Sequence, residues 1–342
     1  MDTDISFAQS LQHITGEESL TSALLYGLSM MNKENLLELE SVWPDIDTDR
    51  RRVIMQQLVD IAEQSFEVDF DPIFLLALND PDSETQAIAI GGLWEDESSE
   101  LIPSFVYLLK QGQTSRVKAA AATALGRYIY LGELEEIDDT ALMVVEQALL
   151  ETIRQPDEDV EVIRRAIEAI AFSSREGIEQ IIENAYYHED ERMRVSAVFS
   201  MGRSYNPKWE SIILTELDNI SPAIRFEAVR ACGELEVKAA VDKLIELIVR
   251  EEDSAVLQNA VWALGQIGGF KAQEVLENLT ASPDDAISAV AEEALNELLL
   301  FSGIMDDFFD FAPPDSDLDT FEDEDDLLYD PGEDDHQIFN LN

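Results

Sequence analysis

Small and apolar side chains recur along the chain at intervals of three residues, with polar residues between them. In the recurring template a first residue, often Arg or Lys, is followed by Ala three and six residues later and by Gly eight residues later. Residues at this spacing share one face of a helix, so each copy predicts a helix with a face of small side chains. Such a face lets a neighbouring helix approach closely, and the glycine either ends the helix or permits tight packing at its end.

Seven copies of the template follow one another. Their last positions are Gly92, Gly126, Ala171, Gly202, Gly233, Gly265 and Asn296. The steps between these positions are 34, 45, 31, 31, 32 and 31 residues, and Arg194 and Arg225 open the two clearest copies. A period near 31 residues predicts an array of structural repeats.

A second amphipathic stretch follows each copy, and Asp or Pro marks the gap to the next one. Leu244, Leu247 and Ile248 show the helical spacing of this second stretch. The gaps contain pairs such as Asp80-Pro81 and Ser221-Pro222, which suit the N-cap and the first turn of a helix. Each repeat is therefore expected to hold two helices.

Further helices are expected towards both ends of the array. Helices over 17–31 and 33–43 would form a first pair, helices over 48–65 and 70–79 a second pair, and a helix over 284–301 would close the array. Together with the template copies, these elements predict an all-α fold of about eight helical pairs.

This pattern resembles the HEAT-repeat superfamily, and most closely the short bacterial HEAT-like repeats named after phycobilin lyases. The resemblance is best between Asp157 and Leu299 and looser over the rest of the chain. It implies an α-solenoid over residues 1–302. It implies little about function, because HEAT arrays serve many roles.

One repeat step is longer than the others, and the extra residues follow Gly126. They include Tyr128 and Tyr130 and continue into the acidic stretch 133–139. Insertions in repeat proteins map to loops and often to binding faces, so these tyrosines are candidate contacts for a partner. The alternative is a longer first helix followed by a solvated acidic linker.

The charge balance of the chain excludes several classes of function. The 342 residues include 73 acidic and 22 basic residues, for a net charge of −51. Direct binding to nucleic acid or to an anionic membrane needs clustered Lys and Arg, so neither is expected. One cysteine, Cys232, leaves no internal disulfide, and neither a signal peptide nor an apolar membrane-spanning run is recognised. A cytoplasmic protein is expected.

The repeat pattern stops after residue 302, and residues 303–342 contain fifteen Asp or Glu and no Lys or Arg. Aromatic residues punctuate this acidic tail: Phe308, Phe309, Phe311, Tyr329 and Phe339. The composition predicts a mostly disordered segment whose aromatic side chains bind a partner. Two alternatives are a solubilising tail, and a tail whose first phenylalanines cap the open end of the array.

Candidate catalytic chemistry is sparse. Deoxyhypusine hydroxylase, a HEAT-like enzyme, holds two irons through several His-Glu dyads, whereas this chain has only His188-Glu189 in its array. No phosphate-binding, nucleophile-elbow, dinucleotide or kinase motif occurs. We therefore expect no catalytic residue, metal site or cofactor, and Cys232 is expected in the core.

Two further features of the array are candidate contacts or structural positions. Core packing is the default expectation for Trp209, as for the other tryptophans, but Trp209 and Tyr205 flank a loop and are candidate partner contacts. Arg194 and Arg225 are expected to form a ladder of ion pairs with turn carboxylates such as Asp190 and Asp218.

These observations favour a non-catalytic scaffold or adaptor that binds a basic protein or peptide, with a monomer favoured. An assembly chaperone for a basic client is a narrower version of this hypothesis. Two alternatives stay open: a HEAT protein like phycobilin lyases, which acts on a chromophore–protein pair, and an acidic mimic of nucleic acid.

Overall fold

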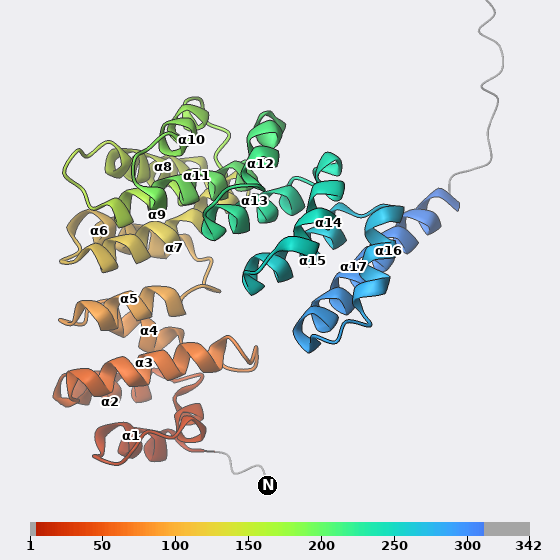
Figure 1. Ribbon diagram of the computed structural model, residues 1–342. Coiled ribbons are helices and arrows are strands. Elements are labelled where there is room, and N and C mark those ends of the chain that lie inside the picture. Colours follow the sequence, from red (N-terminus) through yellow and green to blue (C-terminus); the bar gives the residue numbers. More distant parts are fainter. Residues whose placement is uncertain (1–4, 311–342) are drawn as a thin grey trace, which may run out of the picture. The chain divides into compact units, whose positions relative to one another are not determined.

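The computed structural model describes residues 5–310, and the side chains of residues 5–300. The chain divides into two units, residues 1–298 and 299–342. The described part is helical and contains no strand. Its helices succeed one another in chain order (Figure 1).

Helices in the first unit alternate between two rows. The template row, which carries the template copies from α5 onward, consists of α3 (Thr48–Ala62), α5 (Ser83–Gly92), α7 (Ser115–Glu133), α9 (Val160–Ile170), α11 (Glu191–Arg203), α13 (Pro222–Glu234), α15 (Ser254–Ile267) and the start of α17 (Asp285–Asp310). The second row consists of α2 (Lys33–Val42), α4 (Asp71–Ala77), α6 (Ile102–Gln111), α8 (Asp139–Ile153), α10 (Ile178–Tyr186), α12 (Glu210–Glu216), α14 (Val241–Arg250) and α16 (Phe270–Leu279).

Short elements complete the described chain: α1 (Phe7–Thr15) and the 3-10 helices η1 (Ser22–Leu28), η2 (Trp43–Asp45), η3 (Ser99–Leu101), η4 (Pro207–Trp209) and η5 (Lys238–Ala240). With α1 and η1 beside α2, the described residues form eight helical pairs followed by α17. This is the all-α solenoid that the repeat period predicts.

Aspartates begin most helices of the template row. The carboxylate of Asp82 accepts a hydrogen bond of 2.9 Å from the backbone N–H of Thr85, and that of Asp190 accepts one of 2.9 Å from Arg192. Asp47, Asp159 and Asp253 cap α3, α9 and α15 in the same way. These bonds satisfy N–H groups that have no partner inside the helix, which explains why Asp marks the gaps between repeats.

Consecutive helices of the template row pack against each other far more extensively than those of the second row. A Cβ added to Gly126 would lie 3.0 Å from Cα of Ala169, and one added to Gly202 would lie 2.9 Å from Cα of Ala231. Glycine at these positions therefore permits a backbone approach that any side chain would obstruct. One apolar cluster runs between the two rows from Ile14 to Ala294.

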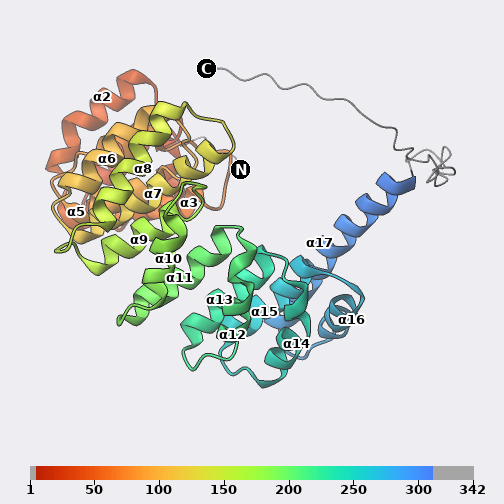
Figure 2. The ribbon, with the colours of Figure 1, turned by 90° about the horizontal axis from the view of Figure 1, so that it is seen from above.

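Three expectations about individual helices need correction or refinement. No helix spans 17–31, because Gly16 ends α1 in extended conformation and residues 22–28 form η1. The closing helix α17 continues to Asp310, beyond the expected end at 301 (Figure 2). The residues after Gly126 lengthen α7 to 19 residues, as the longer-helix alternative predicts, and an exposed acidic turn follows.

Candidate functional site

Two adjoining cavities open on the face of α5, α7, α9 and α11. Their volumes are about 730 Å³ and about 380 Å³, and Thr123, Arg127 and Arg165 line both. We call this continuous surface the arginine groove. It is lined by Ala87, Ile90, Gly91, Trp94, Arg116, Ala119, Ala120, Thr123, Ala124, Gly126, Arg127, Tyr130, Glu161, Arg165, Glu168, Ala169, Phe172, Phe199, Arg203 and Tyr205.

The hollow arises from small side chains where other repeats carry large ones. On α7 the exposed face presents Ala120, Thr123 and Ala124. The position of Thr123, three residues before the template glycine, is Phe199 on α11 and Trp262 on α15. Short side chains on α7 thus leave a space that the larger residues of α11 and α15 would fill.

Aromatic rings line the end of the groove near α11. The ring of Phe172 lies 5.2 Å from that of Tyr130 and 6.3 Å from that of Tyr205, measured between centroids. Tyr130 and Tyr205 are 43% and 58% exposed, and Trp94 at the other end is 46% exposed. Exposed aromatic rings beside a cavity are typical of surfaces that bind peptides or small molecules.

Arg127 lies at the centre of the groove and has unused hydrogen-bonding capacity. Its Nη2 donates to the carbonyl oxygen of Leu93 at 2.8 Å. Its Nε and Nη1 are buried and have no hydrogen-bond partner. Among the described carboxylates none lies within ion-pair distance of Arg127, whose guanidinium carbon is 5.8 Å from the ring centroid of Tyr128. A cation whose donors lack partners favours an acceptor from outside the chain.

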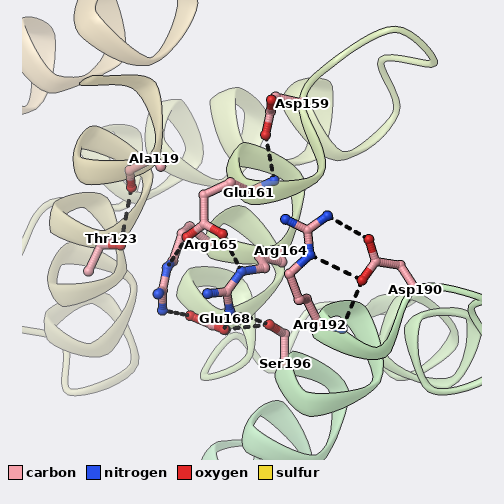
Figure 3. A network of polar contacts seen from close by, with 10 residues as sticks. All are labelled: Ala119, Thr123, Asp159, Glu161, Arg164, Arg165, Glu168, Asp190, Arg192 and Ser196. Carbon is pink, nitrogen blue, oxygen red and sulfur yellow. Dashed lines mark hydrogen bonds and ion pairs between the residues drawn. The ribbon is translucent and has the colours of Figure 1, made fainter. Parts of the chain in front are cut away.

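Next to Arg127, a network of two arginines and two glutamates lies along α9 (Figure 3). Arg164 donates to Glu161 at 2.6 Å, and Arg165 donates to Glu161 at 3.1 Å and to Glu168 at 2.7 Å. Ser196 of α11 donates to Glu168 at 2.5 Å and so links the two helices. Burial alone would raise the pKa of Glu161, but Arg164 and Arg165 hold it below its ordinary value. The network fixes the orientation of Arg165 at the groove.

A second cluster closes the groove on the side of α13. The guanidinium carbon of Arg203 lies 5.4 Å from the ring centroid of Phe172, and that of Arg230 lies 3.9 Å from the ring centroid of Phe199. Arg230 also pairs with Glu227 at 3.1 Å. Burial raises the pKa of Glu227 to about 7, although Arg230 acts in the opposite direction. The cluster keeps Arg203 stacked on an aromatic ring at the groove wall.

Of the candidate contacts in the array that the sequence suggests, the structure places two in the groove and two in the core. Tyr130 and Tyr205, from different repeats, are brought together in the groove. Tyr128 and Trp209 are 0% and 2% exposed and pack in the core. Their assignment as surface contacts is therefore corrected to core packing, since neither ring is available to a partner.

The remaining candidates lie towards the C-terminus. Phe308 and Phe309 fall in the last turns of α17, where the structure describes the backbone alone. Phe311, Tyr329 and Phe339 lie outside the described residues.

The two repeat arginines bind turns, but not through the carboxylates that the sequence suggests. Arg194 donates to the carbonyl oxygens of His188 and Glu189 at 2.9 and 2.8 Å. Asp190 pairs instead with Arg192 at 2.7 Å. The expected ladder through Asp190 is thus incorrect, because the template arginine reaches turn carbonyls first.

Arg225 likewise binds two turn carbonyls, those of Asn219 and Ile220, and it pairs with Glu251 at 2.7 Å. Asp218 pairs with Arg250 and Lys243. The link between repeats at Arg225 therefore runs through a carboxylate that the sequence analysis does not single out.

Three of the groove residues that sequence reasoning missed occupy one position of the repeat. The residue directly after the last template position is Arg127 on α7, Phe172 after α9 and Arg203 on α11. All three line the groove. Comparing this position across the copies would have identified them.

The described part of the chain contains neither a cluster of side chains suited to a metal ion nor a helix suited to crossing a membrane. Between residues 5 and 300, no cluster of three or more His, Cys, Asp or Glu has the arrangement of a metal site. His188 lies in the turn after α10, where its Nδ1 accepts a hydrogen bond from the backbone of Asp190 at 3.0 Å. None of the described helices combines the length and the apolar character needed to cross a bilayer.

Residues 210–296, from α12 into α17, match the family model for HEAT repeats. This stretch contains the template copies that end at Gly233, Gly265 and Asn296. This part of the chain therefore matches HEAT repeats, and the two-row helical array extends beyond it towards the N-terminus.

Two solved structures illustrate the comparison with known folds. The complex of CpcE and CpcF of phycocyanin lyase from Nostoc sp. PCC7120 is 16% identical over 83% of this chain and 96% of that chain, with a TM-score of 0.49. Human deoxyhypusine hydroxylase in complex with glycerol is 16% identical over 86% of this chain and 96% of that chain, with a TM-score of 0.34. No curated protein matches the chain significantly.

Proposed function

We propose that this protein is a non-catalytic, cytoplasmic scaffold that binds a basic protein partner. The observation that carries the proposal is that most Lys and Arg side chains are already paired with carboxylates of the same chain. Every Lys and Arg except Lys33, Arg50, Arg127 and Arg154 forms an ion pair with a described carboxylate of the same chain, while acidic residues exceed basic ones by 51. Most carboxylates therefore have no cation of their own and can attract those of a partner.

The two helical rows support this proposal because they hold the carboxylates in fixed positions. Fifteen of the negative charges belong to residues 303–342, and the other 36 belong to the repeat array. A fixed array of unpaired carboxylates raises the association rate of a basic protein by electrostatic steering and makes the binding salt-dependent. An assembly chaperone for a basic client is the specific form of this function that we favour.

Crosslinking mass spectrometry on complexes purified from the native host tests the proposal. We expect the captured proteins to be enriched in basic surfaces and to be lost at about 0.5 M salt, where the Debye length falls to about 4 Å. Captured proteins without a basic bias, or complexes that withstand this salt, would contradict it.

Deletion of residues 303–342 tests the chaperone form separately. If the acidic tail shields the charge of the client, the deletion weakens client binding strongly, because it removes fifteen negative charges. Unchanged affinity would remove the tail from the mechanism and leave the array as the binding element.

A second candidate function is a lyase-like action on a chromophore–protein pair. The observation that favours it is the larger cavity of the groove, whose volume of about 730 Å³ lies in the range of small-molecule sites. A bilin-dependent change in absorbance with the full chain would support this candidate, and a colourless protein that ignores bilins would remove it.

A further inference from the structure

We infer that the arginine groove binds an extended acidic peptide segment that also carries aromatic or aliphatic side chains, supplied by a partner protein. The inference goes beyond the scaffold role, since it concerns a groove in which arginines outnumber glutamates, in a chain that is otherwise strongly acidic. The groove would bind its acidic ligand whether or not a basic partner occupies the acidic surfaces of the chain.

The charge of the lining residues is the first argument. Four arginines and two glutamates line the two cavities, with no lysine or aspartate, in a chain that is otherwise strongly acidic. Arg116 pairs with Glu84 and has a side chain that is 62% exposed. Arg165 pairs with Glu161 and Glu168, and Arg203 pairs with Glu234. The arginines of the lining thus outnumber its glutamates, but only Arg127 is without a paired carboxylate among the described residues. Carboxylates are the groups that guanidinium ions recognise best in proteins.

Arg127 is the second argument, because it is the lining cation with no counter-ion among the described residues. Its one hydrogen bond, to the carbonyl oxygen of Leu93, fixes the guanidinium against the end of α5. Its Nε and Nη1 are buried without a hydrogen-bond partner, the ring of Tyr128 lies beside the guanidinium, and its charge also acts on the more distant carboxylate of Asp71. A carboxylate that reached these donors would gain more than it does in water. Arg127 is thus the anchor of the groove.

The aromatic rings argue for a peptide rather than for a small anion. Trp94 lies at one end of the groove, and Tyr130, Phe172 and Tyr205 lie at the other. Four neighbouring helices at about 9 Å each span roughly 27 Å from first to last. An extended chain covers this length with about eight residues, since each residue advances about 3.4 Å. Carboxylates would meet the arginines while apolar side chains between them meet the rings.

A binding experiment with defined peptides tests the inference. The probe is a fluorescein-labelled ten-residue peptide with Glu at every third position and Phe or Leu between them. A matched peptide has Gln in place of each Glu, which removes the charge without making the peptide a ligand of the acidic surfaces. Fluorescence anisotropy with the full chain at about 0.15 M salt limits repulsion by distant carboxylates, because the Debye length is about 8 Å. We expect the acidic peptide to bind more tightly than the glutamine peptide.

Two charge reversals localise the binding site. Arg127→Glu should raise the Kd of the acidic peptide by about tenfold or more, the range expected when a charge-assisted contact becomes a repulsive one. Arg154→Glu is the matched control, because Arg154 also lacks an ion pair with the described carboxylates but is exposed and outside the groove. It should change the Kd less than twofold.

Circular dichroism establishes whether the Arg127 variant folds. If it does not, Tyr130→Ala and Tyr205→Ala decide the question, since both rings are exposed and their removal should weaken the peptide that contains Phe. Equal or tighter binding of the glutamine peptide, equal effects of the two charge reversals, or unchanged binding in both tyrosine variants would overturn the inference.

Two further outcomes have defined meanings. If the acidic peptide binds only after deletion of residues 303–342, the occupant is this chain's own acidic segment, and the assignment to a partner protein is overturned. If Arg127→Glu captures basic clients normally but peptide binding is absent even in the unsubstituted chain, the groove inference fails while the scaffold proposal stands.

Discussion

Arg225 holds Glu251 through two hydrogen bonds, from Nε at 2.8 Å and from Nη2 at 2.7 Å. Arg225 lies in the first turns of α13, and Glu251 follows the last residue of α14. The two side chains are only 17% and 4% exposed. Because Nη1 also donates to the carbonyls of Asn219 and Ile220, one side chain joins two turns of adjacent repeats.

Replacing Arg225 by Ala should lower the free energy of unfolding by about 2 kcal/mol, because it leaves a mostly buried carboxylate without its partner. Equilibrium unfolding in urea at pH 7 measures the change. Arg192→Ala is the control, since its pair with Asp190 is largely exposed, and it should change stability much less. Equal losses in the two variants would mean that the Arg225 pair is no more than a surface contact.

Two glycine-to-alanine substitutions should change the stability of the fold in opposite directions. Gly126→Ala places a methyl group 3.0 Å from Cα of Ala169, and we expect it to lower stability by about 1–3 kcal/mol through overpacking of α7 against α9. Gly91→Ala places its methyl group in open space on α5, and we expect it to raise stability by about 0.5 kcal/mol through helix propensity. Thermal unfolding of the two variants beside the unsubstituted chain measures both changes.

If Gly126→Ala proved neutral or stabilising, the template glycines would have no role in close helix packing. The substitution at Gly91 controls for the intrinsic preference of alanine for helices, so that the difference between the variants reports the contact with Ala169 alone.

Asp80 anchors a buried polar cluster, and its loss should be costly. Its carboxylate accepts a hydrogen bond of 2.8 Å from the indole of Trp43 and pairs with Nε of Arg51 at 2.9 Å. The side chain of Arg51 is 6% exposed and that of Asp80 is 0% exposed. Asp80→Ala leaves a buried guanidinium unpaired and should lower stability by about 3–5 kcal/mol. Urea unfolding followed by tryptophan fluorescence measures this loss.

Asp82→Ala is the comparison for Asp80, because it removes a neighbouring carboxylate that caps α5 and pairs with a more exposed arginine, Arg52. It should lower stability by about 1 kcal/mol through loss of the cap. A smaller effect at Asp80 than at Asp82 would contradict the assignment of Asp80 as the buried anchor.

The sequence predicted the array well because the repeat is a local pattern. Alanine and glycine at fixed spacing, as in the copies that end at Gly202 and Gly233, determine each helix locally, and each glycine then packs against the corresponding helix of the next repeat. The helix expected over 17–31 is wrong, because residues 22–28 of that stretch form a 3-10 helix. There, Gly16 ends α1 through its extended backbone conformation.

The candidate site was less predictable, since it depends on which side chains from separate repeats meet. Tyr128 and Tyr130 are two residues apart on one helix, yet only Tyr130 reaches the groove. Arg127 is a candidate anchor because its Nε and Nη1 have no hydrogen-bond partner. Only the structure can show that such a partner is missing. The net charge of the whole chain did not predict the composition of this one surface. The chain carries −51, yet the groove is lined by more arginines than glutamates.

The raised pKa of Glu227 predicts how stability depends on pH. Glu227 faces Arg230 and Glu234 of its own helix, Glu168 of α9 and Arg203 of α11. Burial raises its pKa from 4.5 to about 7, so the folded chain binds a proton in a pH range where the unfolded chain has lost it. The contribution of Glu227 to stability is therefore complete at pH values below its unfolded pKa and decreases as the pH rises towards 7.

Glu227→Gln keeps the shape of the side chain and removes this titration. Relative to the unsubstituted chain, the variant should gain about 2 kcal/mol of stability between pH 5 and pH 8, since one pKa unit corresponds to about 1.4 kcal/mol and the site is partly solvated. Urea unfolding at several pH values measures the difference. Glu293→Gln, the same substitution at an exposed position on α17, is the control and should follow the curve of the unsubstituted chain. A difference between Glu227→Gln and the unsubstituted chain that stays constant with pH would show that Arg230 keeps Glu227 ionised throughout, and the cluster would then hold Arg203 at the groove with the same charge at every pH.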